Sequence, residues 1–323
     1  MRKIDKIDLK ILNELLKNSS QPLSKIGKNV RLSRENVHYR IQKLMKDKVI
    51  KNFVVDISAK KLGFSQYVVF LEFERINKAD EEKIISYLKS QKNISWIGIL
   101  SGKWSLTFDI YVRSVDELNL IVSSILNKFS KEVGDYLVLE LLDSEYFFNK
   151  LINTSRVIHS KINSEKQRYD KRDIKILNEL NKNSRKSYFE ISEQLKISPN
   201  TVKNRIKAME KEGIIGGYSA SINHKSFGYE WHGLQLKLTK PTNEVEQKVI
   251  SYIKNNPKII FYYKYVKSGF YDFDIGVIIR DSTELRNFIN QLRTDFFEQI
   301  KIVDTFLVLE ESSSHNLPQA IFE

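Results

Sequence analysis

The sequence predicts an α+β fold in which two small three-helix modules alternate with two βαββαβ domains. Three observations predict it. The 323-residue chain repeats itself after 165 positions, and each copy passes from helical to alternating apolar periodicity. The excess of positive charge lies in the opening segment of each copy.

The repeat is clearest at the start of each copy. The segment Asp8–Leu15 recurs almost unchanged as Asp173–Leu180, and the same offset holds for more than fifty residues, up to Gly63 and Gly228. Beyond that point the offset drifts by a few positions, which small loop insertions explain. We therefore expect the two copies to share one fold.

Each copy opens with a compact three-helix unit. In the first copy Ile11 and Leu15 lie on one face of a helix, a short second helix runs from Pro22 to near Val30, and Ser33 caps a third helix. The inward-facing residues of the third helix are expected to be Val37, Ile41 and Leu44 in the first copy, and Val202, Ile206 and Met209 in the second.

After the third helix the apolar pattern alternates, over 50–57 in the first copy and 214–222 in the second, which suits the β-wing of a winged helix-turn-helix domain. A βαββαβ order follows, which is the ferredoxin-like arrangement, with helices on one sheet face and the other face free to pair. In the first copy these elements are expected at 66–74, 79–90, 94–101, 105–112, 115–131 and 136–142. In the second copy they are expected at 231–238, 244–255, 259–267, 271–279, 282–299 and 300–309.

The expected domain boundaries follow from these elements. A winged helix-turn-helix domain covers 1–60 and a βαββαβ domain covers 61–142; in the second copy they cover 169–225 and 226–311. A linker occupies 143–168 and a tail 312–323. Because the linker contains the aromatic residues Tyr146, Phe147 and Phe148, we expect its first part to pack.

The distribution of charge gives the first indication of function. Residues 1–60 contain 15 Lys and Arg against 6 Asp and Glu, and residues 165–225 contain 14 against 8, whereas the rest of the chain contains 24 against 26. Two separate basic segments are typical of proteins that bind the phosphate backbone of nucleic acids. The alternative is a lysine-rich composition that only favours solubility.

Several classes of site are missing from the sequence. It contains no cysteine, which excludes disulfides, thiolate metal sites and thiol nucleophiles. The five histidines lack metal-ligand spacing, and neither a GxGxxG nor a Walker loop is present, so we expect no metal, cofactor or catalytic site. No segment resembles a signal core or approaches the ~18 apolar residues of a spanning helix, so we expect a cytoplasmic protein without a membrane partner.

The third helix of each module is the candidate reader of double-stranded DNA. In a helix-turn-helix the second of the two paired helices enters the major groove, where Arg, Asn and Lys bond base edges, while serines at the helix start suit caps or phosphates. The predicted DNA-binding residues are Ser33, Arg34, Asn36, His38, Tyr39, Arg40 and Lys43 in the first copy, and Ser198, Asn200, Thr201, Lys203, Asn204, Arg205 and Lys207 in the second. The alternative is a module that only dimerises.

A family resemblance rests on these residues. The segments Asp173–Leu177, Leu195–Lys207 and Glu212–Tyr218 resemble the DNA-binding domain of the Lrp/AsnC "feast/famine" regulators, and the resemblance covers nearly the whole chain twice. The first copy departs from the pattern with Lys48 in place of Gly213 and Arg34 in place of Pro199, which affects the expected geometry of its wing.

The resemblance also implies an effector site in the βαββαβ domains. In that family a Gly-x-Tyr-Asp type motif lies near an amino-acid site, and the second copy has Gly269, Tyr271 and Asp272, the last suited to an ammonium group. The first copy keeps only Gly102 of this pattern, without the acidic residue. The alternative is a plain hairpin turn.

A row of aromatic residues, Phe261, Tyr263 and Tyr265, alternates along one strand face. Such a row is more often sheet core or a subunit interface than a platform for stacking nucleic-acid bases.

The predicted function is that of a sequence-specific DNA-binding transcriptional regulator of the Lrp/AsnC type that responds to an amino acid or a related small effector. We expect the two copies to pair as a pseudo-dimer within the chain, with a homo-oligomer beyond it. An enzyme similar to the siroheme decarboxylases, which share this architecture, is the main alternative. Their His/Arg-bearing motif would fall in the hairpins at 101–105 and 268–272, and neither contains a histidine. A ligand-sensing scaffold that binds no DNA is the third hypothesis.

Overall fold

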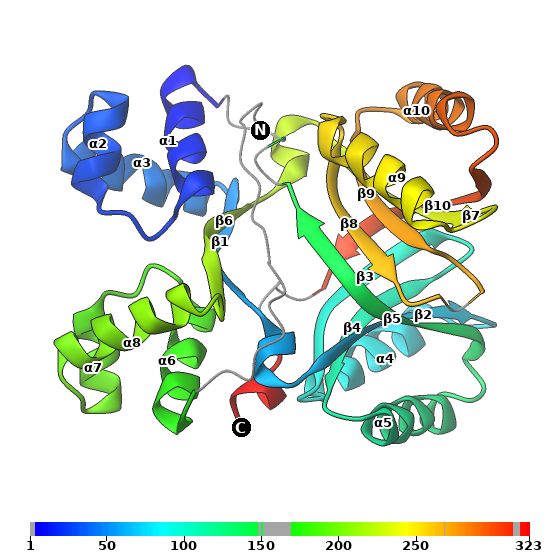
Figure 1. Ribbon diagram of the computed structural model, residues 1–323, viewed down its shortest axis with the longest axis horizontal. Helices are drawn as coiled ribbons and strands as arrows, with labels where there is room; N and C mark the ends of the chain where they lie inside the picture. The colour runs from blue at the N-terminus through cyan, green and yellow to red at the C-terminus, as the bar shows by residue number, and fades with distance from the viewer. Residues whose placement is uncertain (1–3, 148–149, 151–168, 268, 313–316) are drawn as a thin grey trace. The chain divides into compact units, whose positions relative to one another are not determined.

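The computed structural model describes residues 4–147, 150, 169–267, 269–312 and 317–323 (Figure 1). Its contacts divide the chain into two compact units. The first comprises residues 1–58, 146–229 and Phe322, and the second comprises residues 59–145, 230–321 and Glu323. The two copies therefore meet inside each unit, the three-helix modules in the first and the βαββαβ segments in the second.

The first unit contains both three-helix modules, and each begins with the same capping box. Asp5 accepts the backbone N–H groups of Ile7 and Asp8, and Asp170 caps the equivalent helix in the same way. The apolar faces expected from the sequence are buried in both copies. The helices are α1 (Lys6–Lys17), α2 (Leu23–Val30), α3 (Arg34–Lys46), α6 (Lys171–Lys182), α7 (Tyr188–Leu195) and α8 (Pro199–Lys211).

The strand that follows each module pairs with its counterpart in the other copy. Strand β1 (Ile50–Ile57) lies antiparallel to β6 (Ile215–Ile222), and the two form a two-stranded sheet. Helix α1 contacts β6, and α6 contacts β1, so each strand packs on the module of the opposite copy. Both strands lie where the alternating apolar pattern predicts them. They do not form a separate wing in each copy, because they pair with each other and join the two modules.

Equivalent residues of the two copies also bond across this junction. The Ser19 N–H donates to the Tyr218 carbonyl. The Ser184 N–H makes the equivalent bond to the carbonyl of Phe53, the residue of the first copy that corresponds to Tyr218. The hydroxyls of Ser19 and Ser184 lie 3.0 Å apart. Because these residues are 165 positions apart, the modules are related by an approximate two-fold axis, as expected for a pseudo-dimer.

Both βαββαβ segments contribute to one closed barrel in the described residues of the second unit. The strand order is β10-β3-β4-β2-β5-β8-β9-β7, so the copies join at the β5–β8 and β10–β3 pairs. Its first-copy elements are β2 (Ser65–Phe73), α4 (Lys78–Ser90), β3 (Ile94–Gly102), β4 (Leu106–Val112), α5 (Val115–Lys128) and β5 (Val133–Tyr146). Its second-copy elements are β7 (Glu230–Leu238), α9 (Asn243–Asn255), β8 (Ile259–Tyr265), β9 (Phe273–Ile279), α10 (Ser282–Asp295) and β10 (Ile300–Glu311).

Alternation along the strands gives the barrel wall two apolar faces. In the first copy the outer face packs against α4 and α5, with Val69 and Phe108 of the strands in one core with Ile84 and Leu88 of α4 (Figure 1). The other face points into the barrel. Aromatic rings from both copies meet there, including Phe70 with Trp104 and Phe306, and Trp96 with Trp231.

The ends of the barrel domains differ from the sequence prediction. Strand β5 continues through Tyr146, past the expected limit at Leu142, and Phe147 is buried. The rest of the predicted linker, residues 148–149 and 151–168, lies outside the described residues. In the predicted tail, residues 317–323 include the 3-10 helix Gln319–Phe322, and the Ala320 N–H donates to the carbonyl of Lys92. No helix in the described ranges is long and apolar enough to span a membrane.

Candidate nucleic-acid interface

The third helix of each module presents a polar face. Val37, Ile41 and Leu44 of α3 are buried, as are Val202, Ile206 and Met209 of α8. Of the predicted readers, those exposed in α3 are Arg34, Asn36, His38, Tyr39 and Lys43, and those exposed in α8 are Asn200, Lys203, Asn204 and Lys207. None of these side chains has a hydrogen bond or ion pair within the described parts of the chain, so all are available to a ligand.

Two of the predicted contacts, Ser33 and Ser198, serve as helix caps. The Ser33 hydroxyl accepts the N–H of Asn36 at 3.2 Å, and the Ser198 hydroxyl accepts the N–H of Thr201 at 3.1 Å. The Thr201 hydroxyl lies 2.8 Å from that of Ser198. These groups fix where each helix begins and hence which residues form its first exposed turn.

Two other predicted readers, Arg40 and Arg205, hold α3 and α8 to the first helix of their modules. The Arg40 guanidinium donates to Asp5 and to the buried Asp8, each at 2.8 Å, and lowers the pKa of Asp5 below its ordinary value. Arg205 makes the same pair of bonds to Asp170 and Asp173, at 3.0 and 2.9 Å. Both arginines therefore position α3 and α8 from within the protein.

The turn after the third helix of each module is the same in both copies despite the change from Gly213 to Lys48. Both residues have positive φ, 55° at Lys48 and 68° at Gly213. The following residues make equivalent bonds, from Val49 N–H to Leu44 and from Ile214 N–H to Met209, both at 2.9 Å. Lys48 thus accepts a left-handed conformation that costs a non-glycine residue about 1 kcal/mol, and the departure from the family pattern leaves the turn unchanged.

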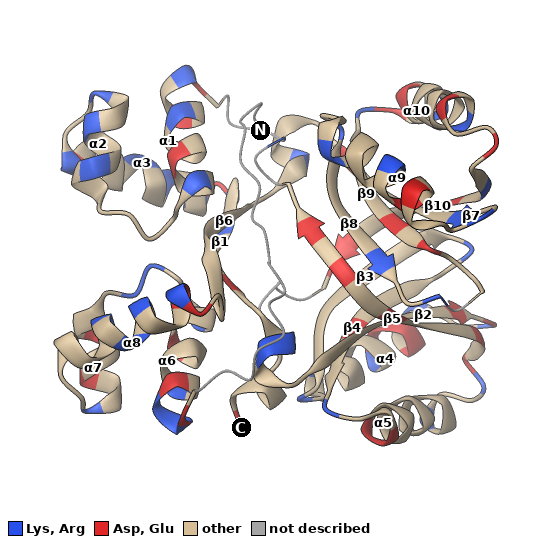
Figure 2. Ribbon diagram, viewed as in Figure 1, with Lys and Arg blue, Asp and Glu red and all other residues tan. Residues whose placement is uncertain are grey.

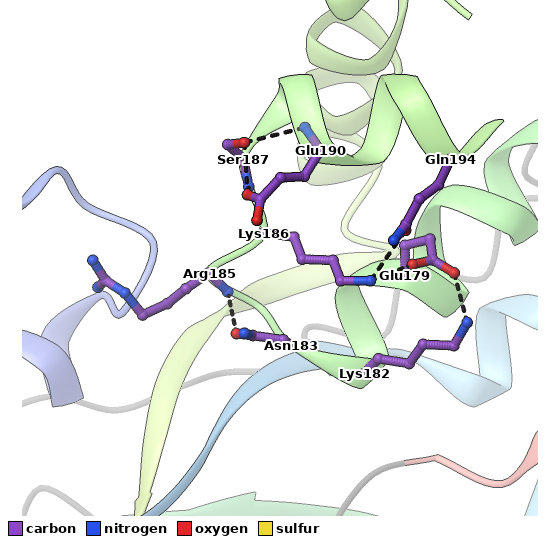
Figure 3. A network of polar contacts seen from close by, with 8 residues as sticks. All are labelled: Glu179, Lys182, Asn183, Arg185, Lys186, Ser187, Glu190 and Gln194. Carbon is purple, nitrogen blue, oxygen red and sulfur yellow. Dashed lines mark hydrogen bonds and ion pairs between the residues drawn. The ribbon is translucent and has the colours of Figure 1, made fainter. Parts of the chain in front are cut away.

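A polar network connects the first and second helices of the second module (Figure 3). Glu179 pairs with Lys182 at 2.6 Å and with Lys186, which also donates to Gln194 at 3.1 Å. Burial raises the pKa of Glu179, but the two ion pairs outweigh burial and leave that pKa below its ordinary value. In the first module the equivalent Glu14 pairs with Lys17 and accepts from the Asn29 amide. The two modules therefore keep the same connection with different partners.

The two helix-turn-helix segments carry unequal charge (Figure 2). Residues 23–46, which span α2 and α3, contain seven Lys and Arg against one Glu. Residues 188–211, which span α7 and α8, contain five against three. The difference is concentrated in the helix before the reader, where Lys25 and Lys28 of α2 correspond to Glu190 and Glu193 of α7, and all four are exposed.

The predicted effector residue Asp272 is bonded within the barrel. It is 4% exposed, accepts the Leu238 N–H at 2.8 Å and lies 3.3 Å from the ammonium group of Lys237. Ser105 has the same place in the first copy, where its hydroxyl accepts the Phe73 N–H at 3.0 Å. Asp272 and Ser105 thus both anchor a hairpin to the neighbouring strand. These contacts are those expected if the motif is a plain hairpin turn.

The other predicted effector residues also belong to the hairpins. Tyr271 is buried and donates to Asp304 at 2.6 Å, while burial and that carboxylate raise its pKa. Gly269 has a φ of 89° with no atom near the position of a Cβ. Gly102 has a φ of 142°, and a Cβ there would lie 3.0 Å from the Thr305 carbonyl oxygen.

The aromatic row of β8 is barrel core. Phe261, Tyr263 and Tyr265 are buried, and successive rings lie 5.2 and 6.5 Å apart. Phe261 also packs against Trp231 on β7 with ring centroids 5.6 Å apart. Rings that are buried in this way are closed to nucleic-acid bases.

Each helical module matches a family of helix-turn-helix domains. Residues 4–45 match the AsnC-type helix-turn-helix domain, and residues 169–215 match a winged helix-turn-helix DNA-binding domain. An uncharacterized HTH-type transcriptional regulator of Pyrococcus furiosus is 32% identical over 143 residues, which cover 91% of that protein and 44% of this chain. The chain belongs to the Lrp/AsnC family. The regulator Ptr1 of Methanocaldococcus jannaschii is 38% identical over 120 residues, 78% of its length.

An Lrp/AsnC relative thus corresponds in length to about one copy of this chain, in agreement with a tandem duplication. Among solved structures, the siroheme decarboxylase NirDL covers 97% of this chain, and the match covers 94% of NirDL, with a TM-score of 0.65 and 14% identity. At that identity the likeness concerns the fold.

Proposed function

We propose that this Lrp/AsnC protein is a sequence-specific DNA-binding transcriptional regulator that reads DNA with α3 and α8. The observation that carries the proposal is the exposed face of the two helices, where Arg, Asn, Lys and His side chains have no partner within the described protein. Such groups bond the edges of guanine and adenine in the major groove. The positive charge of the two opening segments supplies the attraction to phosphate.

Neutralising Lys203 and Lys207 tests the proposal. Both lie on the exposed side of α8, away from its buried residues, so the Lys203→Ala, Lys207→Ala variant should fold normally and bind duplex DNA about tenfold more weakly. Two fewer phosphate or base contacts should also reduce the slope of log K against log salt by up to about two. Fluorescence anisotropy at several salt concentrations measures both quantities.

The matched control removes two exposed lysines of α4, in the Lys78→Ala, Lys89→Ala variant, which changes net charge by the same amount outside the helical modules. This control should retain wild-type affinity. Equal affinity of the α8 variant and the wild type, with the fold intact, would remove α8 as a reader. If binding of duplex DNA by the wild-type protein does not depend on salt concentration, the hypothesis of a ligand-sensing scaffold that binds no DNA is favoured.

The second part of the proposal concerns regulation: an amino acid or a related small molecule acts on the barrel unit. If Asp272 holds an ammonium group in addition to its strand bonds, Asp272→Asn should abolish the binding of that effector, because the neutral amide keeps an acceptor for Leu238 but loses the charge. Ser105→Ala is the matched change in the other copy and should leave binding nearly intact. Calorimetric titration with the twenty amino acids compares the two variants, and equal losses would contradict a role for Asp272.

The enzyme alternative rests on a likeness of fold at 14% identity. Its expected histidine is missing from both hairpins, while relatives at 32% and 38% identity are HTH-type regulators. We therefore prefer the regulator. Incubation with siroheme, followed by its absorption spectrum and by product mass, would reverse this preference if carboxyl groups were lost.

A further inference from the structure

We infer that the DNA element of this chain consists of two dissimilar half-sites, and that the half-site read by α3 receives the stronger phosphate contacts. The inference rests on the proposed function and specifies its target. It combines two features of the first unit: a nearly symmetric frame that holds both readers, and readers that differ in chemistry and charge.

The frame is symmetric because the copies are joined through equivalent atoms. Strands β1 and β6 pair from Ile50 opposite Ile222 to Ile57 opposite Ile215, and Ser19 meets Ser184 at the centre. Each reading helix is then held to its own module by one arginine with two aspartates. Both helices are therefore fixed in equivalent positions of one compact unit, which is the condition for reading two half-sites together.

The residues at equivalent positions on the polar faces of the two helices are unlike. Along the first turns, Arg34, Glu35, Asn36, His38 and Tyr39 of α3 correspond to Pro199, Asn200, Thr201, Lys203 and Asn204 of α8. Arginine pairs with guanine and glutamate accepts from cytosine, whereas asparagine pairs with adenine. Pro199 has no polar side chain at all. Two helices with so little shared chemistry favour different base sequences.

The charge of the helix that precedes each reader differs in sign. Lys25 and Lys28 of α2 stand where α7 has Glu190 and Glu193, and these side chains are exposed. In helix-turn-helix proteins the first of the paired helices crosses the DNA backbone, so α2 attracts phosphates and α7 repels them. The first copy therefore provides most of the electrostatic contact, and the second contributes through its reading face.

Selection of binding sites from a random duplex library tests the inference. The wild type should select two different half-sites with centres one helical turn, about 10–10.5 bp, apart. Giving α3 the five residues of α8, as Arg34→Pro, Glu35→Asn, Asn36→Thr, His38→Lys and Tyr39→Asn, should make a palindrome of the second half-site the preferred sequence. The reverse exchange in α8 should select a palindrome of the first half-site, and it keeps the test decisive if one variant fails to fold.

The charge difference is tested by two single reversals at equivalent positions. Lys28→Glu should weaken binding to the selected site at least fivefold, whereas Glu193→Lys should strengthen it by a similar factor and extend phosphate protection over the second half-site in a footprint. A symmetric wild-type consensus would overturn the inference and leave the regulator standing, because it means that like copies pair between chains. Failure to enrich any sequence, together with salt-independent binding, would overturn the proposed function itself.

Discussion

Replacing Asp109 and Asp274 by asparagine is expected to raise the stability of the barrel at pH 8 and to remove most of its dependence on pH. Both carboxyl groups are fully enclosed, and burial raises the pKa of Asp109 to about 7 and that of Asp274 to about 8. Hydrogen bonds to Gln66 and Tyr263 at Asp109, and to Tyr265 at Asp274, oppose this rise but do not cancel it. The negative charge of Asp109 raises the pKa of Asp274 further.

The sign of the effect follows from proton uptake. Each group has a folded pKa above its ordinary value of 3.8, so the folded barrel binds more protons than the unfolded chain between about pH 4 and pH 8. Stability is therefore greatest at the acidic side of this window and falls as pH rises through the folded pKa values. Each extra proton contributes a slope of about 1.4 kcal/mol per pH unit, so the loss between pH 5 and pH 8 is on the order of 3 kcal/mol or more.

Urea unfolding at pH 5 and pH 8 measures this loss, with tryptophan fluorescence as the signal. The chain contains three tryptophans, Trp96, Trp104 and Trp231, and all are buried in the barrel unit, so the signal reports that unit. The control is Glu82→Gln on the exposed face of α4, which should keep the wild-type dependence on pH. A double asparagine variant with the wild-type slope would show that the buried carboxyl pair does not bind the extra protons.

Much of the fold could be predicted because it is written in local patterns. The apolar spacing of Val37, Ile41 and Leu44 defines the buried face of α3, and the repeat of Asp8–Leu15 as Asp173–Leu180 predicts the second module. The alternation over Ile50–Ile57 gives the bounds of β1 correctly. The helix and strand patterns depend on residues close in the sequence, and the repeat carries them over to the second copy.

The pairing partners could not be predicted, because strand alternation specifies a buried face and not the strand that lies beside it. The sequence therefore predicted a wing within each copy, whereas β1 pairs with β6. The same limit applies to the closed barrel, whose junctions β5–β8 and β10–β3 join strands that are distant in the chain.

Side-chain roles were harder to predict than elements. Arg40 and Arg205 are predicted DNA contacts, and their ion pairs with Asp8 and Asp173 become visible only in the fold. Asp272, proposed to hold an ammonium group, also accepts the Leu238 N–H, a bond that the motif alone does not predict. The buried pair Asp109 and Asp274 belongs to no motif of the sequence, although a polar residue at an inward position of an apolar strand is a signal that could reveal it.

Breaking the β1–β6 pair is expected to reduce affinity for a complete two-half-site element by about 100-fold while leaving the affinity for a single half-site nearly unchanged. Ala220 lies opposite Phe53 in the middle of this pair and is fully buried. Ala220→Pro fixes φ at about −65° and adds a ring at a position with no free space, so it should distort β6 beside β1, and the two modules would no longer be held in one fixed arrangement. Two readers held together gain an effective concentration that two independent readers lack, which commonly contributes 10²–10⁴ in affinity.

The measurement compares anisotropy titrations on full and half elements for three variants. Ala220→Ser adds one atom and leaves the strand dihedrals free, so it should bind the full element as the wild type does. The double change Ser184→Ala, Arg185→Ala leaves the strands intact and removes two side-chain links between the copies, the Ser19–Ser184 contact and the Arg185 bond to the Ser19 carbonyl, so a loss of intermediate size is expected. Because the tryptophans lie in the other unit, their fluorescence should be unchanged in all three. If Ala220→Pro weakened half and full elements equally, the modules would have lost their own folds, and the strand pair would have no role in holding two readers together.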